Sequence, residues 1–210
     1  MPDFKQDLRE QWMLKLPFVA YHLPKSDVLK VFFHEDAELR RLQSYDQSGF
    51  VFSAFESSSS PIVFPEANSK VLKYELIDAK GFAQNKFNIK ENLAEKDRYI
   101  KLLAEAKLRI ETGELKKIVV SRPIKAAYKL EQPEELLLKM AQLYPKALTY
   151  VWFHPKVGLW AGASPEVLAK TYRNWFKTMA LAGTMSVNDN RGWTDKEKDE
   201  QQIVTDDIVE

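Results

Sequence analysis

The sequence predicts an α+β fold, and three observations support this expectation. Segments with apolar residues at helical spacing occur beside segments rich in β-branched and aromatic residues. The order mixes helices with hairpins and shows no internal repeat, which argues against strict βαβ alternation. The 210 residues, 45% of them hydrophobic and 29% charged, are enough to bury a sizeable core.

The first 90 residues are expected to contribute strands to this fold. Residues 31–33 and 49–55 are rich in Phe and Val, as strands often are. A serine run at 57–60 precedes a proline and indicates a loop, which is either a plain connection or a lid over a substrate. We assign residues 1–90 to an N-terminal part of the fold and residues 91–210 to the region with the candidate chemistry.

A helix followed by a strand is expected at the start of the second region. From 93 to 110, apolar residues recur at helical spacing, and Gly113 stands where a helix C-cap favours glycine. Residues 118–120 are all β-branched, which is typical of a buried strand. The helix would therefore lead into a strand that carries the motif KIVVSR, residues 117–122.

Another helix and a hairpin are predicted next. Pro133 and the two acidic residues after it are typical of a first helical turn, and Tyr144-Pro145 indicates where the helix ends. Residues 147–153 and 159–163 then have the pattern of two strands joined by a turn.

The last part of the chain is predicted to end in a helix. Ser164 is expected to cap a short helix that begins at Pro165. After a polar loop at 188–192, Thr194 or Asp195 would cap the last helix, which shows no stop signal. Because its apolar stripe needs a surface to pack against, we expect the polypeptide to continue beyond the last residue given.

Composition narrows the class of partner. The 31 basic and 30 acidic side chains nearly cancel and form no long run of one sign, so no electrostatic footprint for nucleic acid or an anionic membrane is visible. No apolar stretch approaches the roughly 20 residues that span a bilayer. The absence of cysteine excludes a disulfide framework and thiolate chemistry, and no signal-peptide pattern is present. We expect a cytoplasmic protein that acts on a small molecule, in an oligomeric state that the sequence leaves open.

The three histidines give no sign of a metal site. His22, His34 and His154 stand apart without the spacing of metal ligands, and they are expected at the surface or in loops. The sequence also contains no P-loop and no GxGxxG motif, so nucleotide binding has no support. The candidate chemistry therefore rests on lysines and carboxylates.

Two ionisable residues could form an acid/base pair. In a strand at KIVVSR, either Lys116 or Lys117 must point inward because side chains alternate. Desolvation of an inward Lys117 would favour the neutral amine that activates water, whereas a lysine at a strand end could instead reach solvent. Glu166, in the motif GASPE (162–166), would be a proton donor if desolvation outweighs the helix dipole, or otherwise a simple helix-capping residue.

Two further motifs could bind a substrate or a metal. The motif LAGT, residues 181–184, is expected to end a strand with small residues, so its backbone N–H groups could approach a carboxylate, although such a motif alone is an ordinary turn. In KEKDEQQIV, residues 196–204, Glu200 shares a helix face with Ile203 and Val204. An inward carboxylate needs a partner, which would be Mg²⁺ held with water and substrate oxygens, or a buried salt bridge.

Taken in order, the four motifs resemble those of the chorismate-utilising enzymes, the family that includes isochorismate synthase, salicylate synthase, anthranilate synthase component I and aminodeoxychorismate synthase component I. The similarity covers roughly residues 93–208. It implies a four-layer αββα fold with two orthogonal sheets, of which residues 91–210 would form the first part of the chorismate-binding region. A later half would supply another Mg²⁺ carboxylate, so this chain alone is expected to lack part of the site.

The resemblance also implies a role for each motif. Lys117 resembles the base that activates water for attack at C2 of chorismate, and Glu166 resembles the acid that protonates the departing C4 hydroxyl. Glu200 resembles the carboxylate that binds the Mg²⁺ cofactor. A substrate carboxylate would be held by the LAGT turn, at Ala182, Gly183 and Thr184.

Two positions favour one activity within the family. Members that use ammonia typically carry glutamine where Lys117 stands, so lysine favours water as the nucleophile. Aminodeoxychorismate synthases commonly place a nucleophilic lysine at the position of Ala182, where alanine cannot act. The resemblance therefore implies an isomerase of the isochorismate synthase type, in menaquinone or siderophore biosynthesis. The alternatives are salicylate synthase, which adds pyruvate elimination, and a non-catalytic chorismate-binding fragment.

Overall fold

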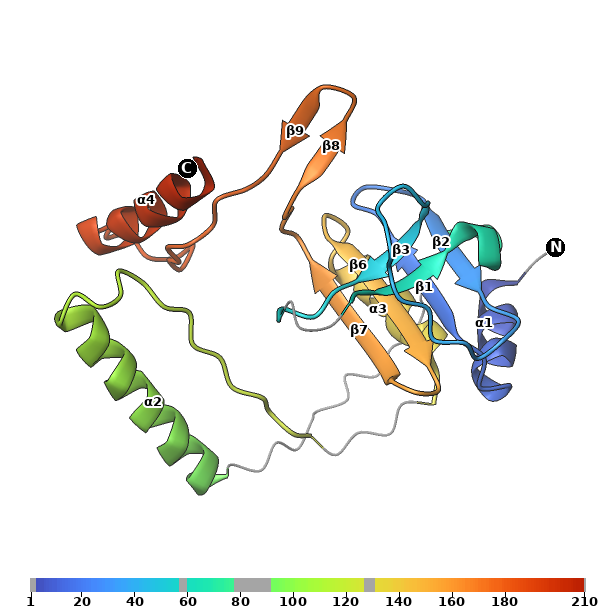
Figure 1. Cartoon of the computed structure of the whole chain (residues 1–210), viewed down its shortest axis with the longest axis horizontal. Coiled ribbons are helices and arrows are strands. Elements are labelled where there is room, and N and C mark those ends of the chain that lie inside the picture. The colour runs from blue at the N-terminus through green and yellow to red at the C-terminus, as the bar shows by residue number, and fades with distance from the viewer. Residues whose placement is uncertain (1–2, 57–59, 78–91, 127–130, 210) are drawn as a thin grey trace. The chain divides into compact units, whose positions relative to one another are not determined.

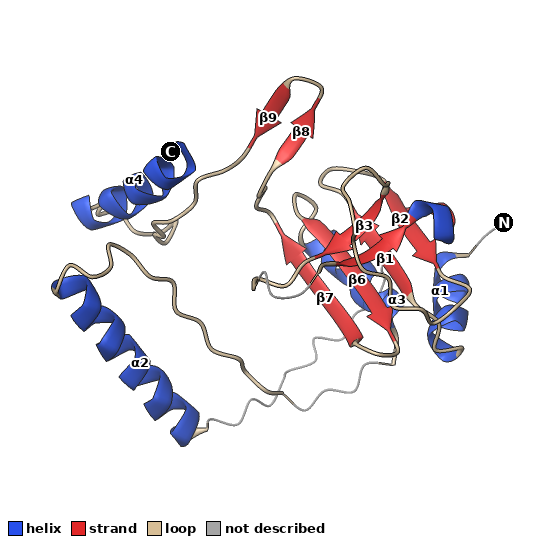
Figure 2. Ribbon diagram, in the orientation of Figure 1, coloured by secondary structure: helices blue, strands red, loops and turns tan. Residues whose placement is uncertain are grey.

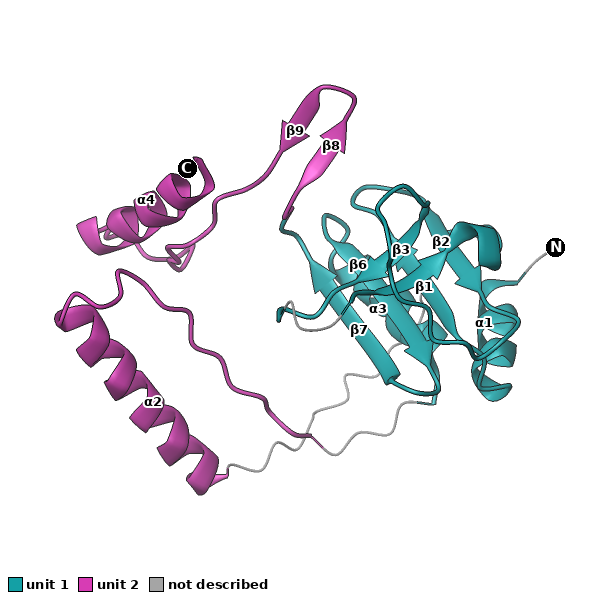
Figure 3. Cartoon of the chain, in the orientation of Figure 1, with its two compact units in different colours: residues 1–84, 129–166 teal, residues 85–128, 167–210 magenta. Residues whose placement is uncertain are grey.

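The computed structural model describes residues 3–56, 60–77, 92–126 and 131–209 (Figure 1). It combines α-helices with antiparallel sheets, as Figure 2 shows, so the expected mixed class with antiparallel pairing is confirmed. The chain divides into two compact units (Figure 3), residues 1–84 with 129–166 and residues 85–128 with 167–210.

The described part of the first unit contains two helices and seven strands. In chain order these are α1 (Phe4–Met13), β1 (Phe18–His22), β2 (Val28–Phe33), β3 (Gly49–Phe52), β4 (Ile62–Pro65), β5 (Lys70–Glu75), α3 (Pro133–Leu143), β6 (Leu148–His154) and β7 (Gly158–Ser164). A 3₁₀ turn at Glu66–Asn68 precedes β5. The expected helix from Pro133 and the hairpin after it are confirmed. So are the strands expected near 31–33 and 49–55, although β3 ends at Phe52.

β1 lies in the middle of a five-stranded antiparallel sheet with the order β5-β2-β1-β6-β7. Phe18 at the start of β1 is opposite Phe33 of β2 on one side and Phe153 of β6 on the other. Because side chains alternate along a strand, the sheet directs apolar groups to both of its faces.

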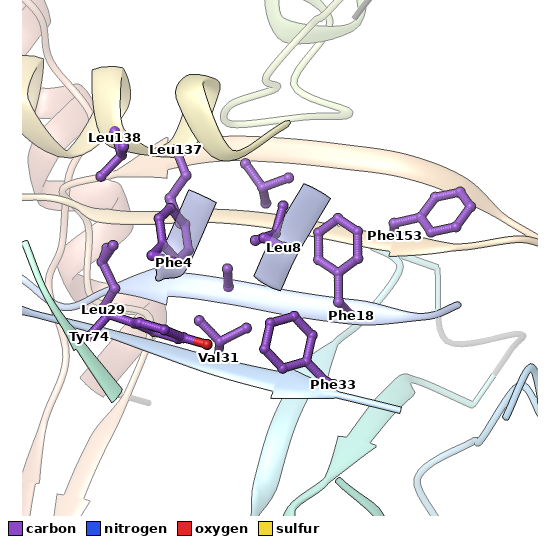
Figure 4. Close-up of a cluster of buried hydrophobic side chains, with 12 residues drawn as sticks. Phe4, Leu8, Phe18, Leu29, Val31, Phe33, Tyr74, Leu137, Leu138 and Phe153 are labelled. Carbon is purple, nitrogen blue, oxygen red and sulfur yellow. The ribbon is translucent and has the colours of Figure 1, made fainter. Parts of the chain in front are cut away.

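The helices α1 and α3 cover one face of this sheet. Figure 4 shows Phe4, Leu8 and Leu137 among the strand side chains of one continuous cluster. Leu8 and Leu137 have no exposed surface. Burying a side chain of this size stabilises the fold by about 1.5–3 kcal/mol, so this helical layer accounts for much of the core.

Two ion pairs join α1 to the first turn of α3. The Glu134 side chain is fully buried, and the Arg9 guanidinium contacts its Oε1 at 2.6 and 2.9 Å. Lys5 lies 2.6 Å from Glu135 in the second pair. Since a buried carboxylate without a partner would be strongly destabilising, Arg9 fixes α1 against the start of α3.

Aromatic side chains cover the other face of the sheet. Phe52 of β3 and Phe64 of β4 contact Trp152 of β6, with ring centroids 5.0 and 5.9 Å away. Trp160 of β7 stacks on Trp152 at 6.1 Å with an interplanar angle of 5°. The β3–β4 pair therefore packs on the face opposite the helices.

The described part of the second unit contains two helices and a short two-stranded ribbon. Its elements are α2 (Leu93–Glu111), β8 (Lys170–Tyr172), β9 (Trp175–Lys177) and α4 (Asp195–Val209). Asn92 caps α2 by accepting hydrogen bonds from the N–H groups of Ala94 and Glu95. Gly113 takes a φ of +76° just beyond the end of α2, so the expected helix with its glycine stop is confirmed. None of the helices described in the chain is long and apolar enough to cross a membrane.

Two expected elements do not form in the described residues. Residues 118–120 were expected to be a strand, but they pair with no described strand, and Val119 is 83% exposed. β-branched residues favour a strand only where a sheet is present to pair with them. The helix expected from Pro165 is also wrong, because Ser164 is the last residue of β7 and pairs with Leu148 instead of capping a helix.

The expectation that the histidines lie at the surface or in loops is wrong for His22 and His154, which end β1 and β6 and are buried. His34 lies in the loop after β2, as expected, but it is buried as well. The His22 Nε2 lies 2.7 Å from the Ser26 carbonyl oxygen, and the Lys156 N–H donates to the His154 Nδ1 at 3.1 Å. Each of these contacts gives one ring nitrogen of a buried imidazole a polar partner.

Replacing Leu137 by alanine is expected to destabilise the first unit strongly. The change removes a fully buried side chain and leaves a cavity between α3 and the sheet, so the free energy of unfolding should fall by about 2–5 kcal/mol. Leu143→Ala is the matched control on the same helix, because that side chain is 61% exposed. Urea unfolding followed by tryptophan fluorescence measures both, and equal effects would contradict the described packing.

The unfolding free energy is also expected to fall in mild acid because of His34. Burial, followed by the positive charge of Arg40, lowers the pKa of His34 from 6.5 to about 4. The pKa of His34 is lower in the folded protein than in the unfolded chain, so protons bind the unfolded chain first as the pH falls from 6.5 toward 4, and the free energy of unfolding decreases over that range. Between pH 7.5 and 5, the free energy of unfolding of the wild type should fall by about 1–2 kcal/mol more than that of a His34→Gln variant. Urea unfolding at each pH measures both. An identical pH dependence in both proteins would remove His34 as the cause.

Candidate functional site

The helix α4 begins with Thr194 and Glu197 in contact, which forms one half of a capping box. The Glu197 carboxylate accepts a hydrogen bond from the Thr194 N–H at 3.1 Å and another from the Thr194 hydroxyl. The hydroxyl hydrogen bond is the main cause that lowers the pKa of Glu197. Thr194, and not Asp195, is therefore the cap, and the pair follows the T-x-x-E pattern that starts many helices.

The Gln201 side chain holds the beginning of the LAGT motif, and the residue before it, against α4. Its Nε2 donates to the Ala180 carbonyl oxygen at 2.8 Å, and its Oε1 accepts from the Ala182 N–H at 3.1 Å. One carboxamide thus forms hydrogen bonds with both a backbone carbonyl oxygen and a backbone N–H group, which lie two residues apart. The Ala182 N–H is therefore occupied by the protein itself, while the N–H groups of Gly183 and Thr184 have no protein acceptor among the described hydrogen bonds.

Gly183 lies directly against the backbone of α4. A Cβ atom on this residue would lie 2.9 Å from the Glu197 carbonyl oxygen and 3.0 Å from the Glu197 Cβ. Only glycine permits this approach. The expectation that LAGT ends a strand is wrong, because residues 178–186 have no regular secondary structure, and the close approach to a helix replaces pairing in a sheet.

Lys117 and Glu200 form an ion pair in the second unit. The Lys117 Nζ lies 3.6 Å from the Glu200 Oε1, and the two side chains are 18% and 34% exposed. The sequence left two alternatives for Glu200, a metal or a salt bridge, and the described partner is this lysine. The structure therefore brings the candidate base and the candidate metal-binding carboxylate together.

The segment that carries Lys117 is anchored to α2. The Leu115 N–H donates to the Arg109 carbonyl oxygen at 3.1 Å, and the Tyr99 hydroxyl donates to the Val120 carbonyl oxygen at 3.5 Å. Arg122 lies over the Tyr99 ring, 5.9 Å from its centroid. These contacts hold the KIVVSR motif in place without a sheet.

Glu166 ends the first unit, and its side chain is exposed. It lies two residues beyond β7, outside any helix, so the helix dipole considered for it does not apply. Gly162, in the same motif, faces Tyr150 of β6: a Cβ there would lie 2.6 Å from the Tyr150 hydroxyl oxygen. The glycine of GASPE therefore makes room for a ring of the aromatic layer.

Glu200 could supply one carboxylate to a magnesium ion, whose remaining ligands would have to be water and substrate oxygens. No group of three or more His, Cys, Asp or Glu side chains converges as a metal site in the described ranges. Mg²⁺ is usually held by one or two carboxylates and completes its shell with water and substrate oxygens. Glu200, whose side chain is partly exposed, could be one such carboxylate.

The fold and site define an α+β protein with a lysine and a carboxylate paired beside a glycine-containing segment. In a comparison with protein families, the chain matches the chorismate binding enzyme family over residues 25–207. The match includes all of the candidate site residues. The chain therefore belongs to the chorismate binding enzyme family, and an enzymatic role with chorismate as substrate is supported. No curated protein and no solved structure matches the chain.

Two contacts of α4 were not predicted from the sequence, the one between Thr194 and Glu197 and the one between Gln201 and residues 180–182. The capping box could have been found, since Thr194 and Glu197 have the required spacing. The contact of Gln201 with residues 180–182 had no sequence signal, because a glutamine on a polar helix is usually exposed. Only the folded chain brings those residues together.

Replacing Gly183 by alanine is expected to destabilise the second unit. The added methyl group would overlap the Glu197 backbone, and Gln201 prevents the segment from moving aside, so the free energy of unfolding should fall by about 1–3 kcal/mol. Val187→Ala, at an exposed position a few residues further on, should have almost no effect. Urea unfolding followed by far-UV circular dichroism compares the two, and a Gly183→Ala variant as stable as the control would mean that this contact is loose.

Proposed function

We propose that the protein is an isomerase of the isochorismate synthase type, which converts chorismate to isochorismate. The observation that carries this proposal is the placement of Lys117 next to Glu200 in a member of the chorismate binding enzyme family. A base beside a metal-binding carboxylate suits the addition of water to a metal-bound, negatively charged substrate.

Lys117 would act as the base. Its Nζ is partly buried and lies 3.6 Å from the Glu200 Oε1. It would take a proton from water only as the neutral amine, so the ion pair would first have to open, as it would where Glu200 binds Mg²⁺ instead. The water oxygen would then attack C2 of chorismate. General base catalysis of this kind contributes about 10²–10⁴-fold to a rate.

Glu166 would act as the acid. In its protonated form it would donate to the C4 hydroxyl as that C–O bond breaks and the leaving group departs as water. One hydroxyl enters and one leaves, while the ring double bonds shift, so the substrate is isomerised without oxidation or reduction. Glu166 is exposed in the described chain, where a proton donor can exchange with solvent.

Glu200 would hold Mg²⁺, which when bound would neutralise charge on the substrate. A cation there would compete with the Lys117 ammonium for the Glu200 Oε1. The N–H groups of Gly183 and Thr184 would face a substrate carboxylate, because the Ala182 N–H is already bonded to Gln201.

The residue types at two positions support water as the nucleophile. Lysine at 117 stands where the ammonia-using members that the chain resembles typically carry glutamine, and alanine at 182 lacks the amine of the aminodeoxychorismate synthases. The proposal includes the four-layer αββα architecture and a cytoplasmic role in menaquinone or siderophore biosynthesis, which rest on this resemblance.

Incubation of the protein with chorismate and Mg²⁺, followed by proton NMR, tests the proposal. Isochorismate without pyruvate is the expected result. Salicylate together with pyruvate would move the assignment to a salicylate synthase. The absence of any product, with chorismate still bound, would contradict both activities.

Replacing Lys117 by alanine is expected to lower kcat by about 10²–10⁴-fold, because the variant lacks the base. Lys116→Ala is the matched control, since this neighbouring lysine is exposed and carries no role in the proposal. Steady-state kinetics with chorismate measures both variants, and circular dichroism verifies that they fold. Wild-type kcat in the Lys117→Ala variant would remove Lys117 from the mechanism.

A further inference from the structure

We propose that Gln201 is a positioning residue. Its carboxamide would orient the LAGT segment, residues 181–184, for substrate binding. The inference rests on the proposed function, in which Gly183 and Thr184 contact a substrate carboxylate. It adds a role for a residue that neither touches the reacting atoms nor binds the metal. Its basis is the pair of hydrogen bonds from Gln201 to the Ala180 carbonyl oxygen and the Ala182 N–H.

The Gln201 carboxamide makes the same pair of hydrogen bonds with residues 180–182 that a neighbouring parallel strand would make. In a parallel sheet, one residue bonds a carbonyl oxygen and an N–H group that lie two positions apart on the next strand. Gln201 makes this pair of bonds with residues 180 and 182, at 2.8 and 3.1 Å. A helix side chain therefore aligns a segment that has no strand partner among the described residues.

The hydrogen bonds of Gln201 also keep the LAGT segment close to Glu200, the proposed metal-binding carboxylate. Gln201 follows Glu200 on α4, and Gly183 lies against Glu197, one turn earlier on the same helix. Two anchors, a pair of hydrogen bonds and a close backbone contact, thus hold residues 180–183 to the turn of α4 that carries Glu200. Release of the carboxamide would leave only the contact at Gly183.

The chemistry at this position requires a group that both donates and accepts. A carboxylate could accept from the Ala182 N–H, but it would place a second acceptor against the Ala180 carbonyl oxygen. The Gln201→Glu substitution should therefore disturb residues 180–182.

Gln202 provides a matched control on the same helix. Its side chain is exposed, and its Nε2 donates to the Asp206 Oδ1 at 2.6 Å, so it makes none of the described hydrogen bonds to residues 180–183. Gln202→Glu introduces the same charge one residue away, so a difference between the two variants reports the hydrogen bonds and not the added charge. Circular dichroism and unfolding midpoints establish that both variants fold.

The test measures the dissociation constant of chorismate with Mg²⁺ by calorimetry, on the full chain, at pH 7.5. Gln201→Glu should weaken binding by about tenfold relative to wild type, and Gln202→Glu by less than about twofold. Hydrogen exchange at the Ala182 N–H, followed by NMR, should be about tenfold faster in Gln201→Met than in Gln202→Met.

Equal chorismate affinities for Gln201→Glu and Gln202→Glu would overturn the positioning role, and so would unchanged exchange at the Ala182 N–H. Failure of the proposed function would be recognised differently, because wild-type protein would then bind chorismate without forming isochorismate. In that case the chorismate affinities of the variants would still decide the role of Gln201.

Discussion

The pairing of β1 with β6 is the interaction on which the first unit depends. It joins two strands from distant parts of the sequence, with Phe18 opposite Phe153 and His22 opposite Thr149. Because β1 also pairs with β2, this register decides which side chains lie under α1 and α3 and which lie under the β3–β4 pair. The chain between β5 and α3 leaves this unit and contributes α2 and the Lys117 segment to the other.

The second unit relies on specific polar contacts more than on a large apolar core. Of its described residues, only Ala106 is a buried hydrophobic residue. α4 compensates for this by carrying three contacts within two turns: Glu197 against Gly183, Glu200 with Lys117, and Gln201 with residues 180–182. Each partly buried contact of this kind contributes only about 0.5–1.5 kcal/mol, so the arrangement of the site depends on all three together.

The sequence predicted elements whose signals are local. α2 and α3 follow from helical spacing, Gly113 and Pro133, and the β6–β7 hairpin follows from two runs of strand-forming residues. It failed where the structure depends on distant partners: residues 118–120 have strand propensity but no strand to pair with, and Ser164 ends a strand instead of capping a helix. For the site, the resemblance selected Lys117 and Glu200, but spacing alone could not show that α2 and α4 bring them within 3.6 Å.

Glu166 is the last residue of the first unit. The register of β7 holds Ser164 opposite Leu148, and beyond Glu166 the Val167 N–H donates to the Met179 Sδ at 3.4 Å. Only Pro165 and Glu166 lie between these anchored points, and the proline ring restricts the backbone further. The proposed acid therefore follows the register of β7, which ends two residues before it, whereas the proposed base is positioned by an ion pair and by its anchors on α2. Acid and base would thus respond to different perturbations: changes in the β6–β7 register should act on Glu166, and changes in α4 should act on Lys117.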